Sequence, residues 1–319
     1  MILITGGLGF IGSNIINSIN SKFIIIENTR YALKRKFYIK NKNKIIKIID
    51  CEKFNSNLLD NYKFSACIHL GAISSTLETN VRKIKRNNVT FSKKIFDYCK
   101  KKKIDFIYAS SAAIYGNGKY GYKDLINTKI QKRYKPLNLY GKSKLEFDTY
   151  ILNNFNKTKI NKIIGLRFFN VYGINEFHKL GQSSPIYKFY HEIKNNNKPI
   201  LYSDFIKNKT IKRDFIYIGD VIRIIKNLLK IKKIKTIINV GTSTPRSFFD
   251  VAKLVCKYTN KKEIIIRDIP QKIKKNYQYI TCSNNKLLKK FKLINNFTSL
   301  ESGIRKYVYY LEKTSFKKF

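Results

Sequence analysis

The chain has no tryptophan, a single methionine and only five prolines among its 319 residues. It also has no apolar run of about 18 residues, which a transmembrane helix requires, so we expect no membrane insertion. The first residues lack the basic and apolar regions of a secretory signal. These absences predict a globular protein of the cytoplasm, and an apolar content of 43% suffices for a large core.

Histidine and cysteine are too few and too scattered to suggest a metal site. The chain has three histidines and five cysteines, and no Cys-x-x-Cys pair. We interpret Cys51, Cys67, Cys99, Cys256 and Cys282 as reduced thiols, and we predict no metal.

Acidic side chains are scarce as well. Aspartate and glutamate number 20 against 65 lysines and arginines, which gives a formal net charge of +45. Such a charge raises the question of nucleic-acid binding. Lysine is spread along the whole chain, however, and accompanies an excess of Ile, Asn, Tyr and Phe, the residues of AT-rich codons. We therefore predict no specific nucleic-acid partner and expect only salt-sensitive attraction to polyanions.

Short apolar runs alternate with longer helical stretches through the first half of the chain. The pattern predicts strands at 2–4, 23–26, 45–49, 67–70, 106–109 and 162–166, and helices at 11–20, 88–101 and 141–155. It indicates an α/β fold with a Rossmann-type, doubly wound parallel sheet. We predict a dinucleotide-binding domain at 1–168, with a returning segment around 215–240. A smaller mixed α/β substrate-binding domain is predicted at 169–214 and 241–319.

Three spaced glycines follow the first predicted strand. Gly6 allows a tight turn, Gly9 lets the backbone approach a pyrophosphate, and Gly12 lets the next helix pack against the strand. The start of that helix offers unpaired N–H groups to a phosphate. The alternative is an ordinary glycine-rich loop between a strand and a helix, because the motif alone is weak.

Tyr140 and Lys144 lie four residues apart at the start of a predicted helix, so they share one face. A neighbouring ammonium favours the phenolate form of tyrosine, so we expect Lys144 to lower the pKa of Tyr140. Ser111 ends the predicted fifth strand, at the edge of a parallel sheet where ligands bind. Serine, tyrosine and lysine together indicate catalysis, whereas an amphipathic helix face with a chance pair is the alternative.

This trio resembles the Ser-Tyr-x-x-x-Lys arrangement of the short-chain dehydrogenase/reductase superfamily, and the opening Thr-Gly-Gly-x-Gly-Phe-Ile-Gly resembles its extended branch. Longer segments are similar to the ADP-glyceromanno-heptose 6-epimerase family, from Met1 to about Tyr310. These segments are residues 69–78, 108–116, 135–141, 167–173, 178–179 and 212–221.

The resemblance implies a nucleotide-sugar epimerase of lipopolysaccharide inner-core synthesis. It implies that NADP, with NAD as the alternative, removes and returns a hydride at C6 of ADP-D-glycero-D-manno-heptose. Inversion needs two acid/base groups. The implied catalytic residues are Tyr140, Lys144, Lys179 and Ser111. The implied cofactor residues are Gly6, Gly9, Phe10, Ile11, Gly12, Glu27, Asn28, Lys34, Leu70, Gly71, Ala72, Ile73, Ser74, Asn87, Tyr140, Lys144 and Val171. The implied substrate residues are Ser111, Asn170, His178, Lys179, Gly181, Lys188, Arg213 and Tyr277.

Three positions depart from the family pattern. Leu70 stands where a glutamate is common, and Leu-Gly-Gln-Ser-Ser follows Lys179 in place of the usual Gly-x-Met-Ala-Ser. Glu27 ends the second predicted strand, where an acidic residue normally repels a 2′-phosphate. The basic residues Arg30, Lys34 and Lys36 offset that charge, so NADP is predicted over NAD.

The family tends to form pentamers, so the resemblance also implies a homo-oligomer. Two other readings stay open. The first is a different extended-branch enzyme, such as a UDP-hexose 4-epimerase or a dehydratase. Ala112 and Ala113 stand where a dehydratase usually carries an acid, which argues against that enzyme. The second is a non-catalytic basic scaffold that binds a nucleotide.

Overall fold

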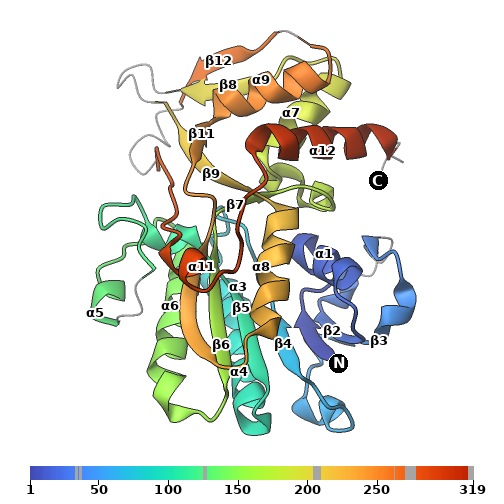
Figure 1. Ribbon diagram of the computed structural model, residues 1–319, viewed down its shortest axis with the longest axis vertical. Helices are drawn as coiled ribbons and strands as arrows, with labels where there is room; N and C mark the ends of the chain where they lie inside the picture. The colour runs from blue at the N-terminus through green and yellow to red at the C-terminus, as the bar shows by residue number, and fades with distance from the viewer. Residues whose placement is uncertain are drawn as a thin grey trace.

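The computed structural model describes residues 1–32, 35, 38–124, 128–203, 210–261, 263–269 and 278–314. Its centre is a parallel sheet of seven strands in the order β10-β6-β5-β4-β1-β2-β3 (Figure 1). The strands are β1 (Ile2–Thr5), β2 (Phe23–Glu27), β3 (Ile45–Asp50), β4 (Ala66–His69), β5 (Asp105–Ser111), β6 (Lys162–Phe168) and β10 (Ile234–Val240). β4, β6 and most of β5 are buried, as expected for strands covered on both faces. This sheet confirms the predicted fold class.

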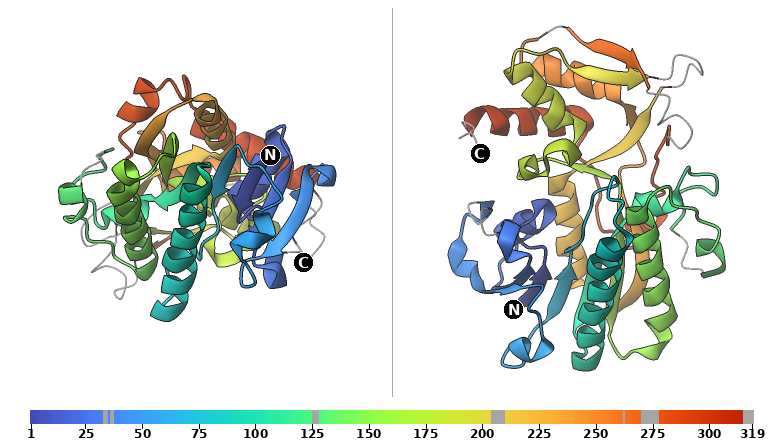
Figure 2. Two further views of the ribbon diagram at one scale, coloured as in Figure 1. Left: turned by 90° about the horizontal axis from the view of Figure 1, so that it is seen from below. Right: turned by 180° about the vertical axis from the view of Figure 1, so that it is seen from behind.

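Helices cover both faces of this sheet, which Figure 2 shows from below and from behind. One face packs against α1 (Phe10–Ser18) and α8 (Ile218–Lys230). The other packs against α4 (Phe91–Lys102) and α6 (Leu139–Asn154). α8 has its apolar residues along one side, so its burial is favourable by about 25 cal/mol per Å² of apolar surface. Each face of the sheet contributes to a separate hydrophobic cluster. The edge at the carboxyl ends of the strands positions the candidate site.

A smaller part lies at the carboxyl ends of the main strands, at the top of Figure 1. It contains a sheet of β11 (Pro245–Ser247), β9 (Lys212–Tyr217) and β7 (Asn170–Tyr172), and a parallel pair, β12 (Ile265–Asp268) with β8 (Ile200–Ser203). The helices α7 (Pro185–Lys194), α9 (Phe248–Tyr258) and α12 (Leu300–Lys313) share one core there. The division at residues 168/169, 214/215 and 240/241 stays a prediction. Leu288, Leu293 and Ile294, which it assigns to the substrate-binding domain, are buried in the core of the main sheet.

Shorter elements connect these parts. They are α2 (Thr29–Ala32), α3 (Val81–Ile84), α5 (Thr128–Gln131) and α11 (Lys286–Lys290), with short 3-10 helices at η2 (Lys42–Lys44), η3 (Ser56–Leu59), η5 (Ala112–Tyr115), η6 (Phe155–Lys157) and η7 (Phe177–Gln182). Between α3 and α4 the helix widens into a π-helical segment, η4 (Lys85–Thr90). None of the helices in the described part of the chain combines the length and the apolar character that crossing a membrane requires.

Candidate active site

The glycine turn joins β1 to α1 and leaves the start of that helix open. Gly6 has a φ of +68°, and a Cβ there would lie 2.8 Å from the backbone nitrogen of Gly71. A Cβ on Gly12 would lie 2.3 Å from the carbonyl oxygen of Gly6. Gly9 caps α1 without a side-chain bond, and no acidic residue stands in the first turn. The free N–H groups and the positive end of the helix dipole therefore fit a pyrophosphate.

The end of β2 faces the same turn. The carboxylate of Glu27 accepts hydrogen bonds from the backbone of Leu8 and of Asn28, each at 3.1 Å. Burial raises the pKa of Glu27. These two bonds and the nearby charge of Arg35 act in the opposite direction and offset part of that rise. The side-chain oxygen of Asn28 is buried and has no hydrogen-bond partner in the described structure. This unpaired oxygen is suited to accept a hydrogen bond from a ribose hydroxyl. Together with the open start of α1, it makes these residues suitable for binding a dinucleotide.

A chain of hydrogen bonds fixes the loop that follows β4. Thr5 accepts from the backbone N–H of Gly71 at 2.9 Å and lies 2.7 Å from Nδ1 of His69. Nε2 of His69 lies 2.8 Å from Ser92, whose hydroxyl donates to the carbonyl of Asn88 at 2.7 Å. Burial lowers the pKa of His69 to about 3, so its imidazole is neutral. These bonds hold Gly71 against the glycine turn, within the predicted cofactor loop 70–74.

Asn88 links that loop to the helix that carries Tyr140, and the sequence did not reveal it. Its side chain accepts from the backbone N–H of Ile73 at 2.8 Å and donates to the carbonyl of Ile73 at 2.9 Å. It also donates to the hydroxyl of Ser143 on α6 at 3.0 Å. Asn88 is fully buried in the π-helical segment η4. The neighbouring Asn87, predicted as a cofactor residue, is half-buried and donates to Lys83 of its own helix.

We expect Asn88→Ala to lower the free energy of unfolding by about 1–3 kcal/mol, because it strips the side-chain partners from the Ile73 backbone and from Ser143. Denaturant unfolding monitored by circular dichroism measures this loss. Asn87→Ala is the matched control, and we expect its change to stay within about 0.5 kcal/mol. Equal losses in the two variants would contradict the role of Asn88.

Ser111, Tyr140 and Lys144 meet where β5 ends and α6 begins. Asn138 caps α6 by accepting from the N–H of Gly141 at 2.8 Å, which places Tyr140 in the first turn. A Cβ at Gly141 would lie 2.7 Å from the carbonyl oxygen of Ala113, so glycine permits this close approach. Ser111 hydrogen-bonds the hydroxyl of Tyr140. The buried ammonium of Lys144 donates to the carbonyl of Ala109 at 2.8 Å.

The ionisation of this trio differs from the expectation that Lys144 lowers the pKa of Tyr140. Burial raises the pKa of Tyr140, and this is the largest effect. The hydrogen bond with Ser111 acts in the opposite direction, while the charge of Asp148 raises the pKa further. Burial also lowers the pKa of Lys144, to about 8. The ammonium points to a backbone carbonyl, and its nitrogen lies 5.9 Å from the centre of the Tyr140 ring. Desolvation therefore determines the direction of both pKa shifts. The extent of burial cannot be read from the sequence, so this direction was not predicted.

Lys179 comes from η7 and lies over the glycine turn, 5.2 Å from the ring centre of Phe10 at the start of α1. Buried Glu176 holds this segment by accepting from Gly173 at 3.2 Å and from the backbone and hydroxyl of Ser184 at 2.7 and 2.6 Å. Burial lowers the pKa of Lys179, and the charge of Glu176 partly offsets that effect. The amine is thus brought nearer to the neutral form that can accept a proton.

His178 faces the segment after β2. Its ring lies 5.5 Å from that of Tyr38, and its Nδ1 is buried without a hydrogen-bond partner in the described structure. Burial, together with the charges of Arg35 and Lys179, lowers its pKa to about 3. A neutral imidazole with one unpaired nitrogen is available to a ligand, on the side of the site where Glu27 ends β2.

The other predicted substrate residues are spread over several elements. Asn170 and Val171 lie half-buried on β7, and Lys188 is exposed on α7. Arg213 on β9 donates to the carbonyls of Lys212 and Tyr279 at 3.0 and 3.1 Å. Gly181 belongs to the turn η7. Lys34 and Tyr277 lie outside the described residues.

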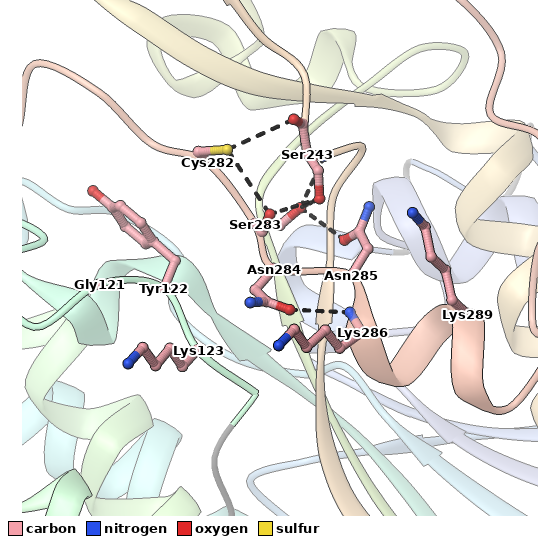
Figure 3. A pocket seen from close by; sticks show the side chains of 10 residues that line it. All are labelled: Gly121, Tyr122, Lys123, Ser243, Cys282, Ser283, Asn284, Asn285, Lys286 and Lys289. Carbon is pink, nitrogen blue, oxygen red and sulfur yellow. Dashed lines mark hydrogen bonds between the residues drawn. The ribbon is translucent and has the colours of Figure 1, made fainter.

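A separate pocket of about 480 Å³ lies between the loop at 121–123 and the segment at 282–289. Figure 3 shows Lys123, Lys286 and Lys289 around it, with hydrogen bonds joining Ser283 to Ser243 and to Asn285. The buried polar groups of this pocket are thus engaged with one another. We therefore place the candidate active site at the glycine turn, η7 and the start of α6.

Comparisons with known proteins identify the family of the chain. A profile of the NAD dependent epimerase/dehydratase family matches residues 2–241. The protein named ADP-L-glycero-D-manno-heptose-6-epimerase from Brachyspira hyodysenteriae is 33% identical over 98% of each chain. The one so named from Fusobacterium nucleatum is 32% identical over 97% of each chain.

Solved structures show the same fold. The crystal structure of the Helicobacter pylori ADP-L-glycero-D-manno-heptose-6-epimerase has a TM-score of 0.79 at 26% identity, covering 98% of this chain and 96% of that one. A UDP-N-acetylglucosamine 4-epimerase from Methanobrevibacter ruminantium has a TM-score of 0.82 at 22% identity, covering 98% of both chains. With this fold, the open glycine turn and the Ser111, Tyr140 and Lys144 trio, the chain belongs to the NAD dependent epimerase/dehydratase family.

Proposed function

We propose that this protein inverts C6 of ADP-D-glycero-β-D-manno-heptose to give the L-glycero isomer. One observation carries the proposal: two groups suited to proton transfer, Tyr140 and Lys179, come from different elements of the site. Relatives of 32–33% identity along nearly the whole chain bear the name of this activity. A bound nicotinamide dinucleotide supplies the hydride acceptor and donor for C6.

The residues of the chain would handle the proton of the C6 hydroxyl. Tyr140, hydrogen-bonded to Ser111, takes or returns that proton for one configuration. Inversion presents the C6 oxygen in a second orientation, which requires a second group, and we assign this task to Lys179. Lys144 would bind the cofactor ribose. The glycine turn would hold the pyrophosphate at the start of α1.

Incubation of the purified protein with ADP-D-glycero-β-D-manno-heptose tests the proposal, with the C6 proton followed by NMR. We expect conversion to the L-glycero isomer with no net oxidation. Turnover of a UDP-hexose without conversion of the heptose would instead establish the alternative of a 4-epimerase. A 4,6-dehydratase would release water and leave a keto sugar. The third alternative, a non-catalytic basic nucleotide-binding scaffold, predicts that no sugar nucleotide is turned over.

We propose NADP as the preferred cofactor because Arg35 acts at the end of β2, near Glu27 and His178. We expect Arg35→Met to weaken NADP binding at least tenfold, given that hydrogen bonds to charged groups contribute about 1.5–3 kcal/mol. NAD binding should change little. Titration of the cofactor-free protein with each nucleotide by calorimetry measures both affinities. The control Arg82→Met removes an equal charge from exposed α3, and it should leave both unchanged. An equal loss for NAD and NADP in Arg35→Met would contradict the assignment.

Location, assembly and pathway are proposed with the activity. All five cysteines are free thiols, which supports a reducing compartment such as the cytoplasm. We propose a homo-oligomer, with a pentamer as the specific form, and a role in the lipopolysaccharide inner core. Sedimentation equilibrium measures the mass of the assembly, and a concentration-independent monomer would contradict this part.

A further inference from the structure

Asp148 lies one helical turn beyond Lys144 on α6, so Tyr140, Lys144 and Asp148 follow one another along a single face. Its carboxylate is fully buried. It accepts from the hydroxyl of Tyr108 on β5 at 2.9 Å and from Nε of Arg167 on β6 at 2.9 Å. A buried carboxylate without such partners would cost several kcal/mol, so this one is built into the core.

Arg167 is also fully buried, and it connects Asp148 to the turn that follows Ser111. Its guanidinium donates to the hydroxyl of Tyr115 at 3.0 Å and lies 5.3 Å from the centre of that ring. Tyr115 closes the turn η5, which begins directly after Ser111. Tyr115 in turn donates to the side-chain oxygen of Asn239 on β10 at 2.6 Å. The network thus connects α6, β5, β6, β10 and the turn after Ser111.

We propose that the buried Asp148–Arg167 pair positions Lys144 and Tyr140 and sets the charge around them. The proposal rests on the function proposed above, in which Tyr140 transfers a proton and Lys144 binds the cofactor. Burying an ion pair contributes little net stability, and replacement by apolar residues is often neutral or stabilising. Asp148 lies one turn beyond Lys144 on the same helix face, so the charge of the pair is placed to act on the residues before it.

Among the residues that the structure describes, few charged groups act on Lys144. His69 from β4 is neutral, since burial lowers its pKa to about 3. Tyr108, Tyr115 and Tyr134 are also neutral, because burial raises the pKa of each. Burial raises the pKa of Asp124 to about 6, against the effect of the Arg167 charge. Asp148 is the carboxylate that raises the pKa of Lys144 against the effect of burial, and it raises that of Tyr140 too.

Removal of the Asp148 charge should therefore shift the pKa values of Lys144 and Tyr140 in the same direction. Without it the pKa of Lys144 falls below its present value of about 8, and the ammonium is lost at a lower pH. The pKa of Tyr140 falls as well, so the phenolate forms at a lower pH. In Asp148→Asn we expect both limbs of the pH profile of kcat to shift to lower pH by about one unit, which is the size of effect that a single nearby charge has on a pKa.

The experiment compares the pH profile of kcat on ADP-heptose in wild-type protein, Asp148→Asn and a control. Tyr108→Phe is the control, because it removes one hydrogen bond to Asp148 and no charge. We expect its melting temperature to fall while its profile stays in place. A lower kcat in Asp148→Asn with an unmoved profile would overturn the proposal, as would a shift to higher pH.

Two further measurements keep the test decisive. If Asp148→Asn does not fold, the double variant Asp148→Asn/Arg167→Gln leaves no unpaired buried charge, and we expect a smaller shift in the same direction. The NMR titration of the Lys144 side chain, assigned with Lys144→Arg, reports its pKa without any turnover. A fall of this pKa in Asp148→Asn supports the pair even if the heptose is not the substrate, so the two failures are distinguishable. An unchanged pKa overturns the proposal.

Discussion

Replacement of Tyr140 by phenylalanine is expected to reduce kcat by about 10²–10⁴-fold, the usual contribution of a general acid or base. The phenol is the group that Ser111 hydrogen-bonds at the end of β5, and phenylalanine keeps the ring while removing the reactive oxygen. Steady-state kinetics with ADP-heptose measure the loss. Cofactor content and melting temperature should stay close to those of the wild type.

Tyr122→Phe provides a matched control for this prediction. Its hydroxyl donates to the carbonyl of Ile280 at 2.5 Å, in the separate pocket of Figure 3 and away from the trio. We expect the kcat of this variant to remain within about twofold of wild type, since the hydroxyl that it loses bonds Ile280 and Gln278 rather than Ser111, Tyr140 or Lys144. Wild-type turnover by Tyr140→Phe would remove this tyrosine from the mechanism.

The second large effect is expected from Gly12→Ala. The added Cβ would lie 2.3 Å from the carbonyl oxygen of Gly6 and 2.7 Å from Cα of Gly7, so the backbone of the turn must move. We expect at least a hundredfold loss of dinucleotide affinity, because about 3 kcal/mol of charge-assisted contact depends on the turn. Fluorescence or calorimetric titration with NADP measures the affinity.

Gly219→Ala makes the same change in the first turn of α8, where the nearest atoms belong to the Tyr217 side chain. A side chain can rotate away, and alanine is favoured over glycine in a helix by about 1 kcal/mol. We therefore expect NADP binding to be unaffected in this control. Comparable losses in both variants would show that helix glycines, rather than the turn, determine the affinity.

The sequence predicted those parts of the fold that depend on local pattern. The run at 162–166 lies within β6, the stretch at 141–155 corresponds to α6, and a helix was expected at 88–101. Ser111, Tyr140 and Lys144 were predicted as one group because strand-end position and helical spacing can be read from the chain. The parallel pair β8 and β12 was missed, since its strands are short and lie far apart in sequence.

Buried polar partners could not be predicted in the same way. Arg167 was noticed only as the start of a motif, and Asp148 was not singled out, although its spacing of four from Lys144 was a usable signal. Glu176 and Asn88 act through backbone groups of distant or irregular segments, for which a sequence offers no pattern. The pKa of Tyr140 was misjudged for a related reason, because desolvation depends on neighbours that only the fold provides.

The order of the main sheet has a consequence for synthesis on the ribosome. β10 pairs with β6 along seven residues, yet it emerges only after the segment that builds β7, β8 and β9. Until then the β6 edge of the nascent sheet stays open, and open edges invite pairing with other chains. Completion of the nucleotide-binding half must therefore wait for the segment of the other half that contains β7, β8 and β9, so the two halves mature as one cooperative unit.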